Sequence, residues 1–234
     1  MALLSCSNLS IGYEGKEVIG GLSFEVCEGD YLCIVGENGS GKSTLMKTIL
    51  GLNPPLGGSI EFGDGLRQTE IGYLPQQTDV QRDFPALVSE IVISGCQNKL
   101  GLRPFYSKED KARAKAMIDK LGLTALEKRC YREMSGGQQQ RALLARALCA
   151  AEKIILLDEP VSGLDPIVTA EMYELIESLN KNDGITVIMI SHDIDAAMKY
   201  ANKILHIGKH VFFGTADEYR NTQGAFASRE GGEA

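Results

Sequence analysis

What this 234-residue sequence lacks already excludes several classes of protein. Its longest apolar stretches, such as residues 185–190, fall well short of the roughly 20 residues that a membrane-spanning helix needs. The first six residues lack a basic region followed by a long apolar run, so we expect no signal peptide and a cytoplasmic location. Repeats and long linkers are also absent, and only the tail at 229–234 has the composition of a disordered segment.

Cysteine and histidine are few, and they are not spaced as metal ligands. The six cysteines include no C-x-x-C pair, so no zinc site is indicated and we expect free thiols. His206 and His210 are four residues apart, a spacing that could hold a metal on a helix. Their surroundings instead favour two short strands around a Gly-Lys turn, which would not bring the rings together.

Basic residues are outnumbered by acidic ones. The 24 Lys and Arg against 31 Asp and Glu give a net charge of −7. Because proteins that bind nucleic acid usually present a net basic face, this balance speaks against a nucleic-acid partner. The length and the 44% hydrophobic content fit an ordinary globular domain with a sizeable core.

A glycine-rich segment at 36–44 is the most informative part of the sequence. It reads Gly-Glu-Asn-Gly-Ser-Gly-Lys-Ser-Thr and lies between an apolar run at 31–35 and a helical pattern at 45–50. This is the strand, loop and helix context of a phosphate-binding P-loop, whose backbone N–H groups surround phosphate oxygens. We therefore predict that the chain binds a nucleoside triphosphate. The predicted binding residues are Gly36, Asn38, Gly39, Ser40, Gly41, Lys42, Ser43 and Thr44.

Two carboxylates at the end of a second apolar strand, residues 154–157, predict the rest of the chemistry. Asp158 at the strand tip can hold Mg²⁺ through water, and Glu159 can orient and deprotonate an attacking water. An acidic pair at a buried strand end is costly unless it has such a role. In the P-loop, Lys42 would reach the β- and γ-phosphates, and the Ser43 hydroxyl would ligate Mg²⁺.

The order of the predicted elements favours an α/β fold. The N-terminal part alternates in strand fashion, first at 3–6 and then at 9–13. Between about 85 and 150 the pattern is helical, with Ser107 placed to cap a long helix through a capping box. Strand character then returns on either side of an amphipathic helix at 167–179. A parallel α/β core interrupted by a helical insertion follows from this order.

A second glycine-rich segment, residues 134–141, precedes a predicted helix at 142–150. It reads Met-Ser-Gly-Gly-Gln-Gln-Gln-Arg, with Ser135 at the N-cap position and glycines that leave the helix end open to an anion. The segment resembles the Leu-Ser-Gly-Gly-Gln signature of ATP-binding cassette (ABC) ATPases, with Met in place of Leu.

The resemblance extends over nearly the whole chain. Tyr13 is at the position where the family stacks an aromatic ring on adenine, and Gln76 falls at the Q-loop. Asp165 lies in a segment that resembles the D-loop, and His192 matches the switch histidine. The implied fold is a P-loop NTPase core with an antiparallel β subdomain and an inserted helical subdomain. The implied boundaries, within a single domain 1–234, are 1–76 and 151–228 for the core and β part, and about 77–150 for the helical signature subdomain.

The resemblance implies that two copies pack head to tail and clamp ATP between them. Lys42, Gln76, Glu159 and His192 would be catalytic in cis, with Asp165 at the seam between copies. The implied Mg²⁺ ligands are Ser43, Gln76 and Asp158. The residues implied to act on the partner copy's ATP are Ser135, Gly136, Gly137 and Gln138.

The connecting segments resemble most the ATPases of zinc and manganese uptake systems, for example at 83–95 and 192–200. This implies a subunit on the inner face of a membrane that drives an integral membrane permease, docked on residues 77–106, with an extracytoplasmic substrate-binding protein contacted only indirectly. Alternatives are another importer or an exporter, for iron–siderophore or cobalamin, and a non-transport ABC ATPase in cofactor assembly, cell division or DNA maintenance.

Overall fold

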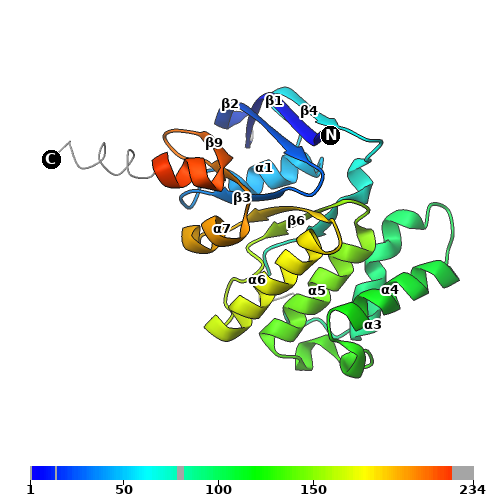
Figure 1. Cartoon of the computed structure of the whole chain (residues 1–234). Helices are drawn as coiled ribbons and strands as arrows, with labels where there is room; N and C mark the ends of the chain where they lie inside the picture. The colour runs from blue at the N-terminus through cyan, green and yellow to red at the C-terminus, as the bar shows by residue number, and fades with distance from the viewer. Residues whose placement is uncertain (1, 14, 78–81, 223–234) are drawn as a thin grey trace. The chain divides into compact units, whose positions relative to one another are not determined.

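The computed structural model describes residues 2–13, 15–77 and 82–222 (Figure 1), so the tail expected to be disordered, 229–234, lies outside the described residues. The chain divides into two compact units. The first unit comprises residues 1–64 and 187–234, and the second comprises residues 65–186. The subdomain boundaries implied at 76/77 and 150/151 stay predictions.

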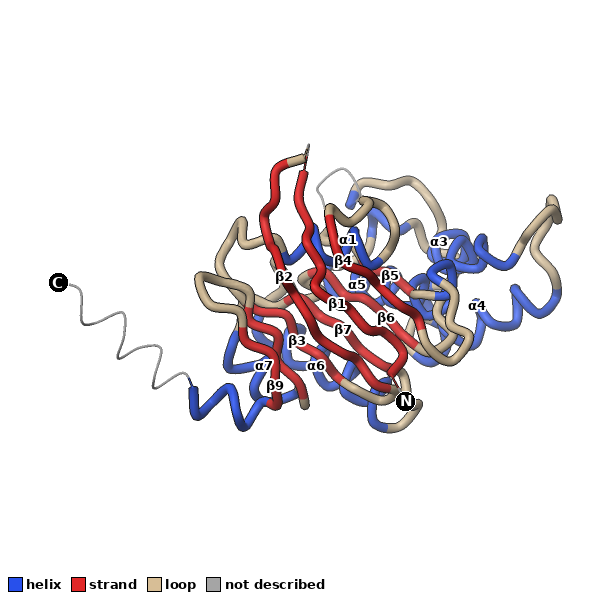
Figure 2. The backbone as a smooth tube through the Cα atoms, turned by 90° about the horizontal axis from the view of Figure 1, so that it is seen from above, coloured by secondary structure: helices blue, strands red, loops and turns tan. Residues whose placement is uncertain are grey.

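An antiparallel sheet in the first unit consists of β1 (Ala2–Tyr13), β2 (Lys16–Cys27) and β4 (Gly57–Phe62), with β1 in the middle (Figure 2). The sequence predicts separate strands at 3–6 and 9–13, and this is wrong, because one strand spans both. Asn8 has a left-handed φ of 47°, and the pairing register shifts between Cys6 and Leu9. This irregularity resets the alternation, so both of these side chains are buried.

The first unit also contains parallel strands. β3 (Tyr31–Val35) pairs with β7 (Thr186–Ile190) on one side and with β8 (Lys203–His206) on the other. Every residue of β3 and β7 is buried, as is typical of parallel strands covered on both faces. β9 (Phe212–Thr215) pairs antiparallel with β8, which confirms the predicted strand hairpin around His206 and His210.

Two helices of the first unit follow its parallel strands. α1 (Lys42–Ile49) follows β3 directly through the glycine-rich loop, and α7 (Ile194–Tyr200) follows β7. The context predicted for residues 36–44 is therefore confirmed: a buried parallel strand, a loop and a helix.

The second unit combines a short parallel pair, β5 (Gly72–Leu74) and β6 (Ile154–Asp158), with helices. Its α-helices lie together in Figure 1. They are α3 (Val88–Ser94), α4 (Lys108–Lys120), α5 (Gly136–Ala150) and α6 (Pro166–Lys181). Its 3-10 turns are η1 (Gln68–Glu70), η2 (Gly95–Lys99), η3 (Thr124–Leu126) and η4 (Tyr131–Glu133). The predicted α/β class is confirmed.

The start of α4 confirms the predicted capping box. The Ser107 hydroxyl accepts a bond from the backbone N–H of Asp110 (3.1 Å), and the Asp110 carboxylate accepts one from the backbone N–H of Ser107 (2.8 Å). Together these bonds satisfy two of the backbone donors that a helix start leaves without partners.

The start of α5 corrects a prediction. The helix begins at Gly136, not at Ala142, so both glycines of the second glycine-rich segment lie in its first turn. Glycine costs about 1 kcal/mol in a helix relative to alanine, which is why the sequence pattern placed the start later. A Cβ atom at Gly137 would lie 2.4 Å from Cγ1 of Val168 on α6. The close approach of α6 therefore requires the glycine and favours the helix despite its intrinsic cost.

Candidate functional site

The glycine-rich loop at 36–44, which we call the phosphate cradle, is held in its curl by backbone conformations that glycine allows. Gly36 has φ 147°, and a Cβ atom there would lie 2.1 Å from the carbonyl oxygen of Ile207. Gly41, the N-cap residue of α1, has φ 98°, and its Cβ would lie 2.8 Å from Cδ1 of Ile19. No side chain caps α1, and no acidic residue lies in its first turn. The positive end of the helix dipole is therefore not offset by a local carboxylate.

Lys42 places a positive charge within this cradle. Its side chain is buried, and its Nζ donates hydrogen bonds to the carbonyl oxygens of Gly36 (2.8 Å) and Glu37 (2.7 Å). The ammonium group is thus folded back over the loop that the sequence predicts to bind phosphate. A cation, backbone donors and a helix N-terminus together form an anion-binding arrangement.

A cavity of about 470 Å³ lies beside the cradle within the first unit. Its lining includes the predicted residues Asn38, Gly39 and Ser40. The Ser40 Oγ is buried and has no hydrogen-bond partner among the described residues. A buried hydroxyl without a partner is unfavourable in the free protein. It is therefore available to a ligand of the cradle.

Tyr13 is positioned by the same helix that begins at the cradle. Its side chain is 47% exposed, which leaves ring surface available for stacking. Its phenol oxygen accepts a hydrogen bond from Lys47 Nζ at 3.4 Å. Hydrogen bonding with Thr44, followed by the interaction with Lys47, lowers the pKa of Tyr13. α1 thus carries both Lys42 and the side chains that hold Tyr13, and Lys47 is a contributor that the sequence reasoning missed.

His192 lies in the first unit, between β7 and α7, and is exposed. The residues on either side of it are bonded to each other. The Ser191 hydroxyl accepts a hydrogen bond from the backbone N–H of Asp193 (3.0 Å), and the Asp193 carboxylate caps α7 by accepting one from Ala196 (2.9 Å). The position after a buried strand is as predicted, and the turn that presents the ring is fixed by these bonds.

In the second unit, Gln76 and Glu159 are brought together. The Gln76 side chain donates a hydrogen bond from Nε2 to Oε2 of Glu159 at 2.8 Å. The contact arises because β5 and β6 are parallel neighbours, so the residues that follow them meet at one edge. Asp158, the last residue of β6, is 4% exposed, as predicted for a buried strand end.

Glu159 has a backbone conformation that is unusual for its residue type. Its φ is 51°, in the left-handed region that costs residues other than glycine about 1–2 kcal/mol. Such conformations persist where the surroundings impose them, and they are common at functional sites. The conformation, together with the bond to Gln76, fixes the direction of the carboxylate.

The signature segment is capped by its own side chains. The Ser135 hydroxyl accepts a bond from the backbone N–H of Gln138 (3.4 Å), and the Gln138 side chain accepts one from the backbone N–H of Ser135 (3.1 Å). Ser135 is thus the N-cap residue of α5, as predicted. The two bonds use the backbone N–H groups of Ser135 and Gln138 and not those of Gly136 and Gly137, so the opening of this helix end to an anion stays a prediction.

Asp165 is the N-cap residue of α6. Its carboxylate accepts hydrogen bonds from the backbone N–H groups of Ile167 and Val168, both at 3.1 Å. Pro166 occupies the first helical position, where its fixed φ suits a helix start. The structure thus assigns a capping function to Asp165, while its role at a seam between copies stays a prediction.

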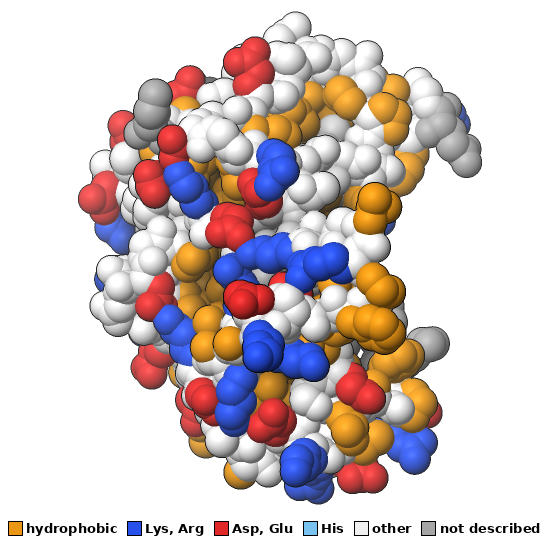
Figure 3. Space-filling model, turned by 90° about the vertical axis from the view of Figure 1, so that its right-hand side faces the viewer, with side chains coloured by type: hydrophobic (Ala, Val, Ile, Leu, Met, Phe, Trp, Pro, Cys, Tyr) orange, Lys and Arg blue, Asp and Glu red, His pale blue; other side chains and the backbone are white. Residues whose placement is uncertain are grey.

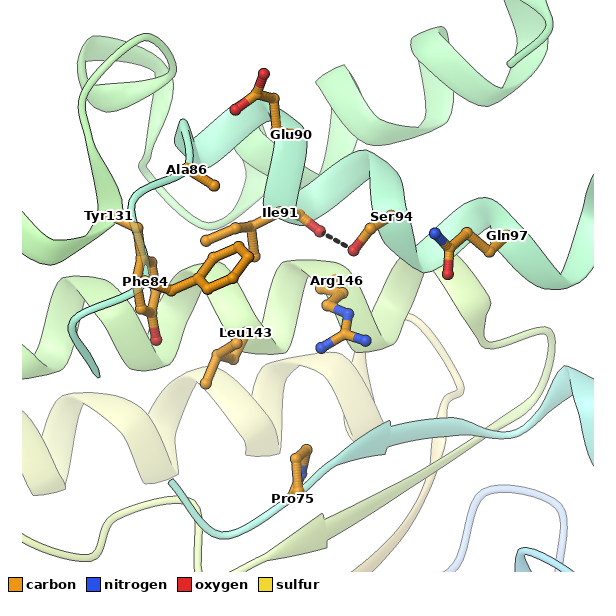
Figure 4. A pocket seen from close by; sticks show the side chains of 10 residues that line it. All are labelled: Pro75, Phe84, Ala86, Glu90, Ile91, Ser94, Gln97, Tyr131, Leu143 and Arg146. Carbon is orange, nitrogen blue, oxygen red and sulfur yellow. Dashed lines mark hydrogen bonds between the residues drawn. The ribbon is translucent and has the colours of Figure 1, made fainter. Parts of the chain in front are cut away.

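A groove of about 380 Å³ in the second unit is largely apolar (Figure 4). Phe84 and Ile91 point into it, and the Arg146 guanidinium reaches in from α5. The groove is lined by Pro75, Phe84, Ala86, Glu90, Ile91, Ser94, Gln97, Tyr131, Leu143 and Arg146. The sequence pointed only to residues 77–106, because no local pattern shows which side chains of α5 face this segment.

The surface itself is mixed in character. On the face seen in Figure 3, exposed hydrophobic side chains and clusters of lysine and arginine lie close together. Among the described residues, no group of three or more His, Cys, Asp or Glu side chains is arranged to hold a metal ion. The described part of the chain also contains no helix that is both long and apolar enough to cross a membrane.

Comparisons with known proteins show which family shares this sequence. A family model described as "ABC transporter" matches residues 19–162. The manganese transport system ATP-binding protein MntB of Bacillus subtilis is 38% identical, over 95% of this chain and 91% of the relative. The zinc uptake system ATP-binding protein ZurA of Listeria monocytogenes is 34% identical, over 94% of this chain and 88% of the relative. YfeB of Yersinia pestis, named for chelated iron transport, is 36% identical, over 89% of this chain and 72% of the relative.

Solved structures agree in fold. An inward-facing ABC transporter described as of the metal-chelate type matches with a TM-score of 0.83 and 32% identity, over 93% of this chain and 85% of that chain. The protein cbiO1 of Clostridium perfringens, part of an ABC transporter complex, matches with a TM-score of 0.81 and 27% identity, over 97% of this chain and 94% of that one.

Proposed function

The chain belongs to the ABC transporter family as an ATP-binding, ATP-hydrolysing subunit, and from this premise we propose that it drives import of a divalent metal ion, zinc or manganese. The observation that carries the choice of metal is similarity along nearly the whole chain to proteins named for manganese and zinc transport. The metal would be cargo that never touches this subunit.

The proposed roles follow the site residue by residue. The phosphate cradle binds the triphosphate, with Lys42 at the β- and γ-phosphates and Tyr13 stacked on adenine. Glu159 accepts a proton from the attacking water, and the bond from Gln76 supports its orientation. His192 acts at the γ-phosphate. In a dimer of this chain, Ser135 and Gly137 meet the nucleotide held by the partner copy, with Asp165 near the seam.

Magnesium is the proposed cofactor beside ATP. The proposed ligands are the Ser43 hydroxyl, the side-chain amide of Gln76 and, through water, the Asp158 carboxylate. All of these offer hard oxygen donors, the type that Mg²⁺ prefers, and none offers sulfur. The ion would neutralise charge on the β- and γ-phosphates.

The proposed membrane partner is a permease whose cytoplasmic helix docks in the groove of the second unit. Apolar lining residues suit one face of an amphipathic helix. The exposed guanidinium of Arg146 offers an acidic side chain or a helix C-terminus a charged partner. This docking would place the chain on the inner face of the membrane, with any substrate-binding protein reached only through the permease.

A second candidate is import of iron or a metal chelate. It is favoured by the similarity to YfeB, which is named for chelated iron transport, and to a transporter described as of the metal-chelate type. The two candidates share the ATPase chemistry and differ only in cargo.

The test measures total cell metal and growth under chelation in a host that lacks this gene, with zinc, manganese or iron restored singly. We expect accumulation of zinc or manganese to be lost, and to be restored by the wild-type chain but not by Glu159→Gln. Loss of iron alone would favour the second candidate. Unchanged content of all three metals would overturn the import proposal.

A further inference from the structure

A buried polar network connects α5, which we call the signature helix, to the segment that follows Gln76. At its centre is Gln139, which lies one turn into α5 and is only 4% exposed. Its Nε2 donates to the carbonyl oxygens of Arg82 and Tyr131, both at 3.0 Å. Its Oε1 accepts a bond from Gln77 Nε2 at 3.2 Å. The Gln139 side chain therefore uses both its donor and its acceptor on three other residues of the second unit.

Gln76 and Gln77 are adjacent, but their side chains reach different partners. Gln76 donates to Glu159 at 2.8 Å, whereas Gln77 donates to the Tyr131 hydroxyl at 2.7 Å as well as to Gln139. Because the two residues share a peptide bond, a displacement of Gln77 changes the backbone from which Gln76 reaches the carboxylate. The pair thus links the hydrolysis residue Glu159 to the network around Gln139.

Tyr131 joins this network to the groove. Its ring lines the groove, while its hydroxyl accepts the bond from Gln77 (Figure 4). Burial raises the pKa of Tyr131 to about 12, so the phenol stays neutral and the network does not depend on pH near neutrality. Phe84, two residues beyond Arg82, lines the same groove. An occupant of the groove would contact side chains on both sides of the network.

Helix stability alone does not explain a glutamine at this position. Burying an amide side chain costs free energy that its hydrogen bonds only offset, whereas a leucine of similar size would contribute favourably by burial. An apolar side chain would serve packing at position 139 at least as well. What glutamine adds is a directional connection among Gln77, Arg82 and Tyr131.

We propose that Gln139 is a positioning residue that ties Gln76 and the signature helix to the docking groove, so that occupation of the groove by the permease sets the Gln76–Glu159 contact. This inference rests on the proposed function. It names how the membrane partner controls hydrolysis, and it assigns the control to Gln139, Gln77 and Tyr131. Gln139 touches neither nucleotide nor water in this scheme and acts through Gln77.

The test compares ATP hydrolysis by the isolated subunit with hydrolysis by the complex that a tag on this chain recovers from host membranes. Gln139→Leu removes the bonds of Gln139 to Gln77, Arg82 and Tyr131, and Gln77→Leu removes only the bonds by which Gln77 joins Tyr131 and Gln139. We expect both variants to keep ATP affinity within about twofold and to lower the stimulation by the membrane complex about tenfold, within the range of coupling between sites. The second variant keeps the test valid if Gln139→Leu fails to fold.

Asn98→Leu is the matched structural control. The Asn98 amide donates to the carbonyl oxygens of Thr69 (2.7 Å) and Ala150 (3.1 Å), so its loss weakens the other end of α5 without touching Gln77. We expect a comparable fall in melting temperature with unchanged stimulation. Equal loss of stimulation in all three variants would overturn the inference in favour of general destabilisation, and unchanged stimulation in Gln77→Leu and Gln139→Leu would overturn it directly. Absence of stimulation in the wild type would instead contradict the proposed function.

Discussion

The phosphate cradle of the first unit and the proposed hydrolysis residues of the second unit are held by different kinds of interaction. Backbone conformation shapes the cradle, with Gly41 at φ 98° and no side chain capping α1. Side chains hold the second unit's residues, through the bond from Gln76 to Glu159 and the reciprocal cap of Ser135 and Gln138. We infer that the backbone curl of the cradle is set before a ligand arrives, and that only Lys42 must leave its bonds to Gly36 and Glu37 to reach phosphate. In the second unit, side-chain bonds set the positions of the residues themselves.

This difference predicts that changes in the cradle alter nucleotide affinity in the isolated subunit. Changes at Glu159 or Ser135 in the second unit should alter the rate of ATP hydrolysis and leave ATP affinity unchanged. The predictions below test that division, beginning with the largest expected effect.

Glu159→Gln should lower the rate of ATP hydrolysis by ~10²–10⁴-fold, the usual contribution of a general base. ATP affinity should be unchanged, and a closed dimer should accumulate with ATP. Phosphate release and size-exclusion chromatography with ATP measure the two effects. Rapid turnover by this variant would remove Glu159 from the proposed role, and weak ATP binding would break the division between the two regions.

Lys42→Ala should weaken ATP binding by about 100-fold, because charge-assisted hydrogen bonds to phosphate contribute roughly 3 kcal/mol. Equilibrium dialysis or fluorescence titration of the isolated subunit measures the change. Lys42→Arg is the matched comparison, because it keeps the positive charge but not the compact shape of the ammonium group. An ATP affinity equal to that of the wild type would contradict the assignment of residues 36–44 as the phosphate cradle.

Gly41→Ala should weaken ATP binding at least about tenfold, because a left-handed φ penalises alanine and its Cβ would lie 2.8 Å from Ile19. Gly29→Ala is the control, with φ 80° and no atom within 4 Å of the added Cβ. Both variants should lose roughly 1–2 kcal/mol in free energy of unfolding from the backbone conformation. Only Gly41→Ala should lose affinity, and equal ATP binding by both would show that the curl of the loop is not needed.

Ser135→Ala should have the smallest effect on the isolated subunit, a loss of about 1 kcal/mol in free energy of unfolding and no change in ATP affinity. Ser107→Ala removes the equivalent bond from the capping box of α4 and should destabilise the chain similarly. Hydrolysis should fall only in Ser135→Ala. Weaker ATP binding by the isolated Ser135→Ala subunit would contradict the proposed action of this residue on the partner copy's nucleotide.

The sequence predicted those features that depend on spacing within one segment. The strand, loop and helix around residues 36–44, the capping box at Ser107 and the buried strand before Asp158 belong to this class, because a few neighbouring residues determine them. The error at 3–13 arose because a single left-handed residue, Asn8, carries one strand through an interruption in its pattern.

Features that depend on contacts between distant segments were not predictable. The helical start at Gly136 depends on Val168, and the bond from Gln76 to Glu159 joins residues 83 positions apart. Likewise, no local pattern marks Arg146 as part of a groove or Gln139 as part of a network, because most positions of α5 are buried, polar ones among them. Such partners appear only when the fold is known.

The left-handed backbone at Glu159 has a consequence for any attempt to improve this protein. Laboratory evolution that selects only for heat resistance should enrich substitutions of Glu159, because glycine or asparagine tolerates a φ of 51° better than glutamate does. Under the role proposed for Glu159, each such substitution would give a more stable chain that hydrolyses ATP far more slowly. Selection on temperature and selection on metal uptake should therefore diverge at this residue.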